Sequence, residues 1–137
     1  MHQAFKYRIY PTEEQKSYLL RTMGACRFIY NWGVATKTEQ YTLTKKSDGF
    51  AGLCKKLTKI KTGKETVWLN ECPNVCLQQS LKHVETAFTK FFKKQTRYPS
   101  FHSRHENRGS ATYTSVGFRI RNGNLSLSRM AGEAEVR

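Results

Sequence analysis

The segment FKYRIYPTEEQKSYLLRTMGACRFIYNWGV, residues 5–34, decides how the chain begins to fold. Residues 5–10 alternate, with apolar side chains at the odd positions and Lys6, Arg8 and Tyr10 at the even ones. A period of two residues predicts a half-buried β-strand whose outer face is basic. Pro11 has no backbone N–H to donate and ends this strand.

A helix is predicted directly after Pro11. Thr12 and Gln15 have the T-x-x-Q spacing of a capping box, in which the two side chains satisfy backbone donors at a helix start. The helix should therefore begin at Glu13. Apolar residues then recur at helical spacing and predict a buried face. They are Leu19, Met23, Cys26 and Ile29 or Tyr30. Gly24 predicts a kink or a break within this helix.

Two further amphipathic helices are predicted after the first. Ser47 or Asp48 is available as the N-cap of one, which spans 50–60 and has apolar residues every three or four positions. Pro73 suits the first turn of the other, which has the clearest apolar stripe in the chain. Between them, residues 68–69 are interpreted as an apolar plug. Three helices with facing stripes can form a small bundle.

The chain after residue 110 is predicted to form antiparallel strands. Residues 111–116 are strand-like, and Asn122-Gly123 is a strong signal for a two-residue type I′ turn. This turn pairs residues 118–121 with 124–127, so that the apolar residues share one face of the hairpin and two arginines share the other. Residues 130–137 alternate weakly and predict one more strand.

The predicted fold is α+β: a small antiparallel OB-like β-barrel into which a three-helix bundle is inserted. In this interpretation, residues 1–11 supply the first barrel strand, 12–96 the helical lobe, and 97–137 the remaining barrel strands, incomplete at the C-terminus. The first strand is expected to return and pair with the hairpin. Small barrels of this type bind single strands of nucleic acid.

The charge balance indicates a polyanionic partner. The chain has 24 Lys and Arg against 10 Asp and Glu, a formal net charge of +14. So large a charge destabilises a compact chain through self-repulsion, and nucleic acid would relieve it. A basic surface that serves only solvation is the alternative. No apolar run approaches the length of a membrane span, and no signal-peptide pattern opens the chain, so a cytoplasmic protein is expected.

Neither a metal site nor a catalytic centre is predicted. Among the four cysteines, Cys72 and Cys76 form a single C-x-x-x-C pair, without the second pair that a closed zinc site requires. A nuclease would need clustered carboxylates to hold divalent ions, whereas the ten acidic residues are scattered along the chain. No cofactor is expected, and the chain is interpreted as non-catalytic.

The candidate binding residues combine cations with aromatic and amide side chains, because cations meet phosphates and aromatics stack on unpaired bases. The predicted nucleic-acid contacts are Lys6, Arg8, Arg27, Asn31, Lys55, Lys59, Arg97, Tyr98, Phe101, Arg104, Arg119 and Arg121, with Arg108 in the same loop as Arg104. For Tyr98 and Phe101, packing beneath the loop is an equal alternative. Asn74 and Gln78, one turn apart at a helix start, could bond base edges, although ordinary helix surface is the simpler interpretation.

A series of short motifs runs in order through nearly the whole chain. It begins with the first strand, Tyr10-Pro11-Thr12 and GACRFIYNW at 24–32. The later motifs are LTKIK at 57–61, WL at 68–69, LQQSL at 77–81, AFTKFF at 87–92, YPSF at 98–101 and NGNL at 122–125. In this order the motifs resemble the start of the TnpB/OrfB proteins of bacterial insertion sequences, which are RNA-guided nucleases related to the type V CRISPR effectors.

The resemblance implies a wedge-type barrel interrupted by a helical recognition lobe, which together clasp a guide RNA scaffold and its heteroduplex. It also implies that the lobe reads a short DNA motif beside the target, through Phe50, Asn74, Val75 and Gln78. A bacterial, nucleoid-associated location is expected. The family's RuvC-like nuclease domain and cysteine-rich zinc module are not found in these residues. A truncated or decayed transposon element, or a fragment, is therefore expected.

The expected function is nucleic-acid binding by the N-terminal region of a transposase-like TnpB/OrfB protein, without catalysis. Two alternatives stay open. One is a helix-turn-helix DNA-binding accessory or repressor of a transposon, which would use residues 13–32 and is motivated by Gly24. The other is part of an active RNA-guided DNA endonuclease that a separate polypeptide completes.

Overall fold

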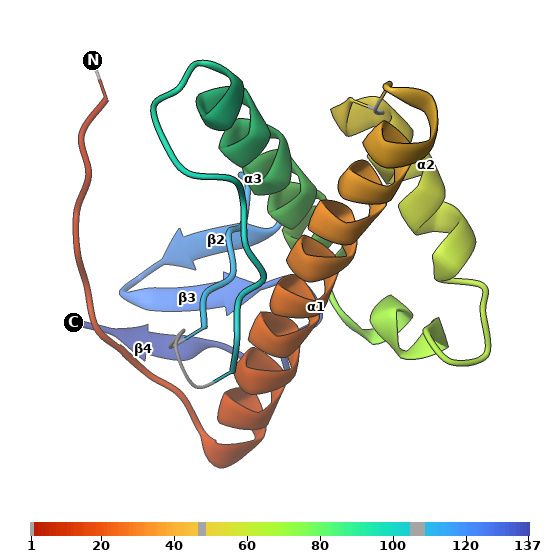
Figure 1. The fold of residues 1–137 in the computed structure, drawn as a ribbon. Coiled ribbons are helices and arrows are strands. Elements are labelled where there is room, and N and C mark those ends of the chain that lie inside the picture. Colours follow the sequence, from red (N-terminus) through yellow and green to blue (C-terminus); the bar gives the residue numbers. More distant parts are fainter. Residues whose placement is uncertain (1, 47–48, 105–108) are drawn as a thin grey trace.

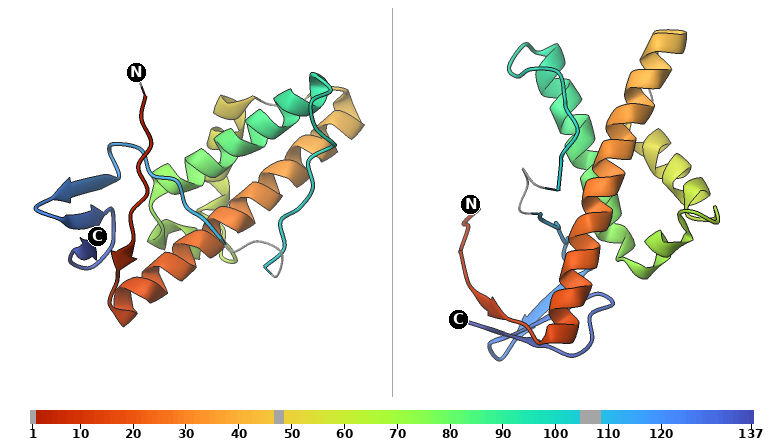
Figure 2. Two further views of the ribbon diagram at one scale, coloured as in Figure 1. Left: turned by 90° about the vertical axis from the view of Figure 1, so that its left-hand side faces the viewer. Right: turned by 60° about the horizontal axis from the view of Figure 1, so that its bottom comes forward.

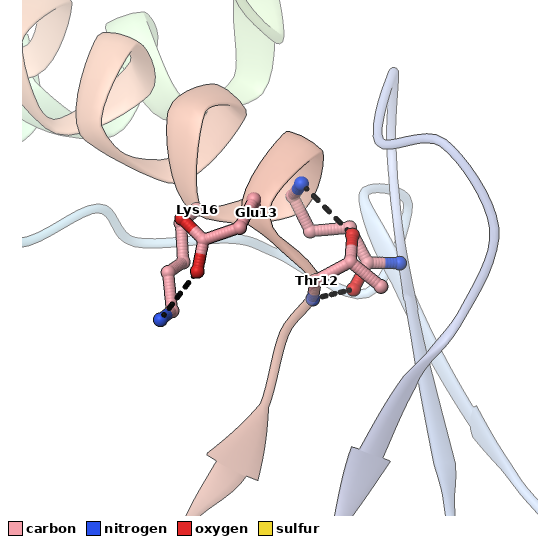
Figure 3. Close-up of polar contacts among 4 residues, drawn as sticks. Thr12, Glu13 and Lys16 are labelled. Carbon is pink, nitrogen blue, oxygen red and sulfur yellow. Dashed lines mark hydrogen bonds and ion pairs between the residues drawn. The ribbon is translucent and has the colours of Figure 1, made fainter.

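The longest element is helix α1 (Glu13–Thr44), seen in a computed structural model that describes residues 2–46, 49–104 and 109–137. The predicted capping box is confirmed at its start. The Thr12 backbone N–H donates to Gln15 Oε1 at 2.9 Å, and the Gln15 backbone N–H donates to Thr12 Oγ1 at 3.2 Å. Glu13 faces the positive end of the helix dipole and pairs with Lys16 at 3.1 Å (Figure 3). These contacts explain why the helix begins at Glu13.

Helix α1 runs through Gly24 without interruption, so the predicted break at this residue is wrong. A glycine inside a helix costs about 1 kcal/mol relative to alanine. That cost is small beside the burial on either side of Gly24, because Thr22 and Ala25 are both almost fully buried. Packing therefore overrides the local preference of glycine. The turn that a helix-turn-helix motif would need within residues 13–32 is not present in the structure.

The buried face of α1 is shifted from the predicted one. Cys26 and Ile29 are buried as expected, whereas Leu19 and Met23 are only partly buried. The buried residues of the helix are Gln15, Tyr18, Thr22, Ala25, Cys26, Ile29, Gly33, Val34 and Lys37. Many of these residues are polar or small, and hydrophobic periodicity does not reveal such a face.

The other helices follow their sequence patterns. Helix α2 (Phe50–Ile60) buries Leu53 and Leu57, and α3 (Asn74–Phe92) begins directly after Pro73. A short 3₁₀ helix, η1 (Val67–Glu71), lies between them and contains the predicted plug. Within it only Leu69 is buried. The N-cap of α2 is Gly49, and the two candidate caps before it, residues 47–48, lie outside the described residues.

The main core lies between the three α-helices and η1. Its buried residues are Ala25, Ile29, Val34, Leu53, Leu57, Leu69, Cys72, Leu77, Leu81, Val84 and Phe88. Gly33 allows α3 to approach α1, because a Cβ added to it would lie 3.0 Å from Val84 and 3.1 Å from Leu81. A partly buried ion pair adds to this contact, with Lys37 Nζ 3.0 Å from Glu85 Oε2.

Four short strands form one antiparallel sheet. They are β1 (Ile9–Tyr10), β2 (Phe118–Arg121), β3 (Asn124–Leu127) and β4 (Ala134–Val136), in the order β1-β4-β3-β2. The register predicted for the β2–β3 hairpin is confirmed at all its pairs, from Phe118↔Leu127 to Arg121↔Asn124. Asn122 and Gly123 have φ angles of 53° and 76°, the positive values that a type I′ turn requires.

The predicted barrel is wrong, because the sheet is open. Strands β1 and β2 are its two edges, and β4 separates β1 from the hairpin with which it was expected to pair (Figure 1). The fold is therefore α+β, with helices beside an open four-stranded sheet. Only Ile9 and Tyr10 of the first predicted strand find a partner strand, and residues 111–116 form no strand. A period of two is not sufficient where no neighbouring backbone is available for pairing.

A second, smaller core joins the sheet to the start of α1. Tyr18, Leu127, Met130 and Ala134 are its buried members. The Tyr18 hydroxyl donates to the Ser128 carbonyl at 2.6 Å and lies 2.7 Å from the Tyr113 hydroxyl. Burial raises the pKa of Tyr18 and of Tyr113. Helix α1 thus carries the sheet beside its first turns, with α2 and η1 on its other side (Figures 1 and 2).

The two helical glycines of α1 provide a matched stability test. Gly24→Ala should raise the free energy of unfolding by about 1 kcal/mol through helix propensity, because its new Cβ meets only Arg27 at 3.8 Å. Gly33→Ala should lower it, since overpacking against Val84 and Leu81 costs about 1–3 kcal/mol and outweighs the same gain. Urea unfolding of both variants checks the signs. A Gly33→Ala variant as stable as Gly24→Ala would contradict the close approach of α3.

The Gln15 side chain provides a second test. Gln15→Ala should lower the free energy of unfolding by about 2–3 kcal/mol, because it removes the reciprocal cap and the two hydrogen bonds to the carbonyls of Ala131 and Glu133. Ser17→Ala, at an exposed position two residues away, should change it by less than about 0.5 kcal/mol. The same urea titration measures both variants, and equal small effects would show that the cap is dispensable.

Candidate nucleic-acid interface

One face of the sheet is basic, and the register shows which side chains form it. Leu125 and Ala134 belong to or pack against the second core, and the pairing of Ile9 with Val136 puts Ile9 on the same face of the sheet. Their neighbours in each strand therefore point away from that core. The backbones of Arg8 and Arg137 exchange two hydrogen bonds of 2.9 Å and extend the β1–β4 pairing by one residue. The outward-pointing residues are Arg8, Tyr10, Arg119, Arg121, Asn124, Ser126, Glu135 and Arg137, which we call the outer face.

The outer face brings together cations from both ends of the chain. Three of its arginines were predicted contacts, namely Arg8, Arg119 and Arg121. Arg137 was not predicted, because only the β1–β4 pairing places it there. Its Nε lies 2.8 Å from Glu135 Oε1, and its guanidinium lies 4.9 Å from the centroid of the Tyr10 ring. Edge to edge the sheet spans three strand spacings, roughly 14 Å, so its cations suit an extended polyanion better than a single phosphate.

Lys6 lies in the extended arm of residues 2–8, which runs beyond the sheet (Figure 1). Phe5 and Tyr7 of this arm are exposed, with ring centroids 6.4 Å apart. The arm therefore presents a cation and two aromatic rings beyond the β1 edge of the sheet.

The segment after α3 is held against the helices by two predicted contact residues. The Asn31 amide donates to the His102 carbonyl at 2.9 Å and accepts from the His102 backbone N–H at 2.8 Å. Tyr98 packs edge-on against Phe88 and Phe91, and its hydroxyl lies 2.6 Å from Thr38 Oγ1. Asn31 and Tyr98 thus have internal partners, and for Tyr98 the packing alternative is the one observed.

The same segment borders an open groove of about 540 Å³ against α3, lined by Lys90, Arg97 and His102 among others. His102 stacks on Tyr30 with centroids 4.1 Å apart and planes 5° apart. Phe101 and Arg104 are exposed beside this groove. Arg108 lies outside the described residues.

The remaining predicted cations lie on the helices. Lys55 and Lys59 are exposed on α2, while Arg27 is half-buried on α1. Near the start of α3, the Lys61 ammonium donates to Asn74 Oδ1 at 2.8 Å. Burial and the nearby charge of Arg129 lower the pKa of Lys61. Two cations therefore lie close together at this helix start, a contact that the sequence did not predict because Arg129 follows the hairpin.

The residues expected to read a DNA motif are only partly brought together. Asn74, Val75 and Gln78 share the first turns of α3, with Val75 packed so closely on Gly117 that an added Cβ would lie 2.8 Å from its Cγ1. Phe50 instead lies beneath Lys82, whose Nζ is 5.7 Å from its ring centroid. Lys82 is eight residues beyond Asn74, roughly 12 Å along the helix axis. Phe50 therefore lies beside the middle of α3, with Lys82, Glu85 and Thr86, and not at the helix start.

Within the described residues, no group of three or more His, Cys, Asp or Glu side chains is placed to hold a metal ion. Cys72 and Cys76 are buried among the helices, and burial raises the pKa of the Cys72 thiol. A hydrogen bond to Cys26 and burial likewise raise the pKa of Cys76. None of the helices in this part of the chain combines the length and the apolar character needed to cross a membrane.

Known proteins are similar to this chain along most of its length. Residues 1–46 match the helix-turn-helix domain of the OrfB/IS605 family. A Streptomyces pristinaespiralis protein named "Putative RNA-guided DNA endonuclease" is 40% identical over 134 residues, which cover 98% of this chain and 33% of that protein. An Escherichia coli K12 protein named "Putative RNA-guided DNA endonuclease InsQ" is 36% identical over 105 residues. These residues cover 77% of this chain and 26% of InsQ.

A third relative is matched over almost its whole length. The virulence protein VsdF of Salmonella dublin is 32% identical over 114 residues, which cover 77% of this chain and 96% of VsdF. The chain spans about a third and about a quarter of the length of the first two relatives. The order of motifs, the matched domain and these identities agree, and the chain belongs to the TnpB/OrfB (IS605) family of insertion-sequence proteins.

Proposed function

We propose that this chain binds nucleic acid through the outer face of the sheet and the segment of residues 97–104, and that its ligand is a structured guide RNA. The observation that carries the proposal is the outer face itself. Arg8 and Arg137 come from the two ends of the chain and lie on the same face as Arg119 and Arg121. Glu135 is the sole carboxylate among the outer-face residues defined above.

The charge of the chain supports the same proposal. A net charge of +14 causes repulsion in the absence of a counter-charge, and, after burial, the charge of Arg129 helps to lower the pKa of Lys61. Phosphates near these cations would relieve it and release condensed counterions. Exposed aromatic residues, such as Phe101 and Tyr7, can stack on unpaired bases beside the phosphate contacts.

We further propose that the helices contact DNA beside the target of the guide. Asn74 and Gln78 lie at the start of α3, where amide groups can bond adenine edges and nearby Lys61 can contact a phosphate. Phe50, the first residue of α2, would contact DNA separately from Asn74 and Gln78, because it lies beside Lys82, farther along α3. A helix-turn-helix repressor is a weaker candidate, since α1 has no turn.

We propose that the residues of this chain do not themselves cleave DNA. Among the described carboxylates, Glu71, Glu85 and Glu135 each lie within 4 Å of a basic side chain, on three different elements. Such a distribution favours electrostatic pairing over a shared divalent ion, which requires carboxylates held together. The two relatives named as RNA-guided DNA endonucleases are about three times as long, and a nuclease completed by further residues or by a separate chain is compatible with this proposal.

The outer face can be tested with a charge-matched pair of double variants. Arg119→Ala/Arg121→Ala should weaken binding of structured RNA about tenfold, because each exposed ion pair contributes roughly 0.5–1 kcal/mol. It should also lower the slope of log Kd against log salt concentration by about 1 to 2, because two phosphate contacts are lost. Lys45→Ala/Lys46→Ala removes the same charge at the far end of α1 and should change affinity less. Fluorescence anisotropy across a salt series measures both. Equal losses of affinity in the two double variants would mean that binding depends only on the net charge of the chain and not on the outer face.

The DNA contact can be tested by selection from a randomised duplex library. Asn74→Ala/Gln78→Ala should broaden the selected motif, because a good bidentate contact is worth about 1–3 kcal/mol of discrimination. The salt dependence of binding should not change, since neither side chain is charged. Thr89→Ala, at an exposed position farther along α3, serves as the control. If the double variant selects the same motif as the parent chain, Asn74 and Gln78 do not contact the bases and are ordinary surface residues of the helix.

A further inference from the structure

The side of α1 that faces η1 is hollowed on both sides of Phe28. One pocket of about 280 Å³ lies between α1 and η1 and is lined by Thr22, Gly24, Phe28 and Trp68, among others. A second, of about 400 Å³, shares Phe28 and adds Trp32 and other residues. Small-ligand pockets typically have volumes of about 300–1,000 Å³. The first pocket is close to this range, and the second lies within it. We call the first of them the Trp68 slot.

The Trp68 slot has flat walls and an open floor. Phe28 and Trp68 are 38% and 39% exposed, and their rings meet edge to face with centroids 5.4 Å apart. A Cβ added at Gly24 would meet nothing within 4 Å except Arg27, so the space above this glycine is empty. Such a shape admits a planar ring, which could stack on the indole.

The polar groups of the slot fit one kind of occupant. Arg21 and Arg27 line it and can meet phosphates, whereas Glu71 can only accept hydrogen bonds and lies 3.8 Å from Arg21.

We propose that the Trp68 slot binds an unpaired base of a single-stranded RNA, a proposal that rests on the nucleic-acid binding proposed above. The base stacks on Trp68, its flanking phosphates meet Arg21 and Arg27, and the ribose 2′-hydroxyl donates to the Glu71 carboxylate. RNA recognition generally relies on unpaired bases stacked on aromatic side chains. The slot lies between α1 and η1, whereas the outer face belongs to the sheet and points away from the second core. It is therefore a site distinct from the outer face.

The chain has two tryptophans, so Trp32→Phe leaves Trp68 as the sole tryptophan signal. A short oligoadenylate RNA, labelled for anisotropy, should quench Trp68 fluorescence over the same concentration range in which it binds. Duplex RNA should bind without quenching, because its bases are already stacked. Oligoadenylate DNA, which has no 2′-hydroxyl, should quench less at equal concentration.

Two variants remove the slot in different ways. Trp68→Ala removes the stacking surface, and Gly24→Leu fills the slot with a good helix former that needs no backbone change. Each should weaken binding of the single-stranded RNA at least about fivefold, the lower end of what one stacked base contributes. Duplex RNA should bind both with unchanged affinity. Val67→Ala, an exposed neighbour that does not line the slot, is the control.

The outcomes separate the slot from the wider function. Binding of single-stranded RNA without quenching, and without an effect of Gly24→Leu, overturns the slot but leaves nucleic-acid binding intact. Equal quenching by RNA and DNA overturns the assignment to RNA. Absence of binding to any RNA overturns both proposals. A Gly24→Leu variant at least as stable to heat as the parent excludes misfolding as the cause of a loss.

Discussion

The Gln15 side chain holds the two ends of the chain together. Its oxygen caps the first turn of α1, while its amide donates to the carbonyls of Ala131 and Glu133 at 2.8 and 3.2 Å. Both carbonyls lie just before β4, the strand on which both β1 and β3 pair. One buried amide therefore positions the start of the helix and the strand at the centre of the sheet. Without β4, Arg8 and Arg119 would not share a face.

Local sequence patterns predicted the parts of the fold that depend on near neighbours. The capping box, α2, α3 and each pair of the β2–β3 hairpin follow from spacing and turn chemistry within a few residues. The pairing of β1 with β4 joins residues about as far apart as the chain allows, and no local pattern specifies it. The barrel was wrong for this reason, and Arg137 was not recognised as part of the outer face.

The candidate site shows the same division. Arg119 and Arg121 were placed correctly because the hairpin register decides their side of the sheet. Asn31 and Tyr98 are exposed polar and aromatic types that sequence alone assigns to ligands, yet they clamp residues 98–102 onto the helices. The Trp68 slot depends on η1 lying across from Gly24, a tertiary contact that neither motif predicts. Polar and small residues on the buried face of α1 concealed which side of the helix would carry each surface.

The chain thus has two surfaces suited to nucleic acid, the outer face of the sheet and the Trp68 slot between α1 and η1. The central claim is that RNA lies against the outer face. Photo-cross-linking of 4-thiouridine-labelled RNA, mapped by mass spectrometry of the peptides, tests it directly. Cross-links at Tyr10 and within residues 118–127 and 134–137 are the predicted result. Cross-links confined to α2 and α3, with none on the sheet, would contradict it.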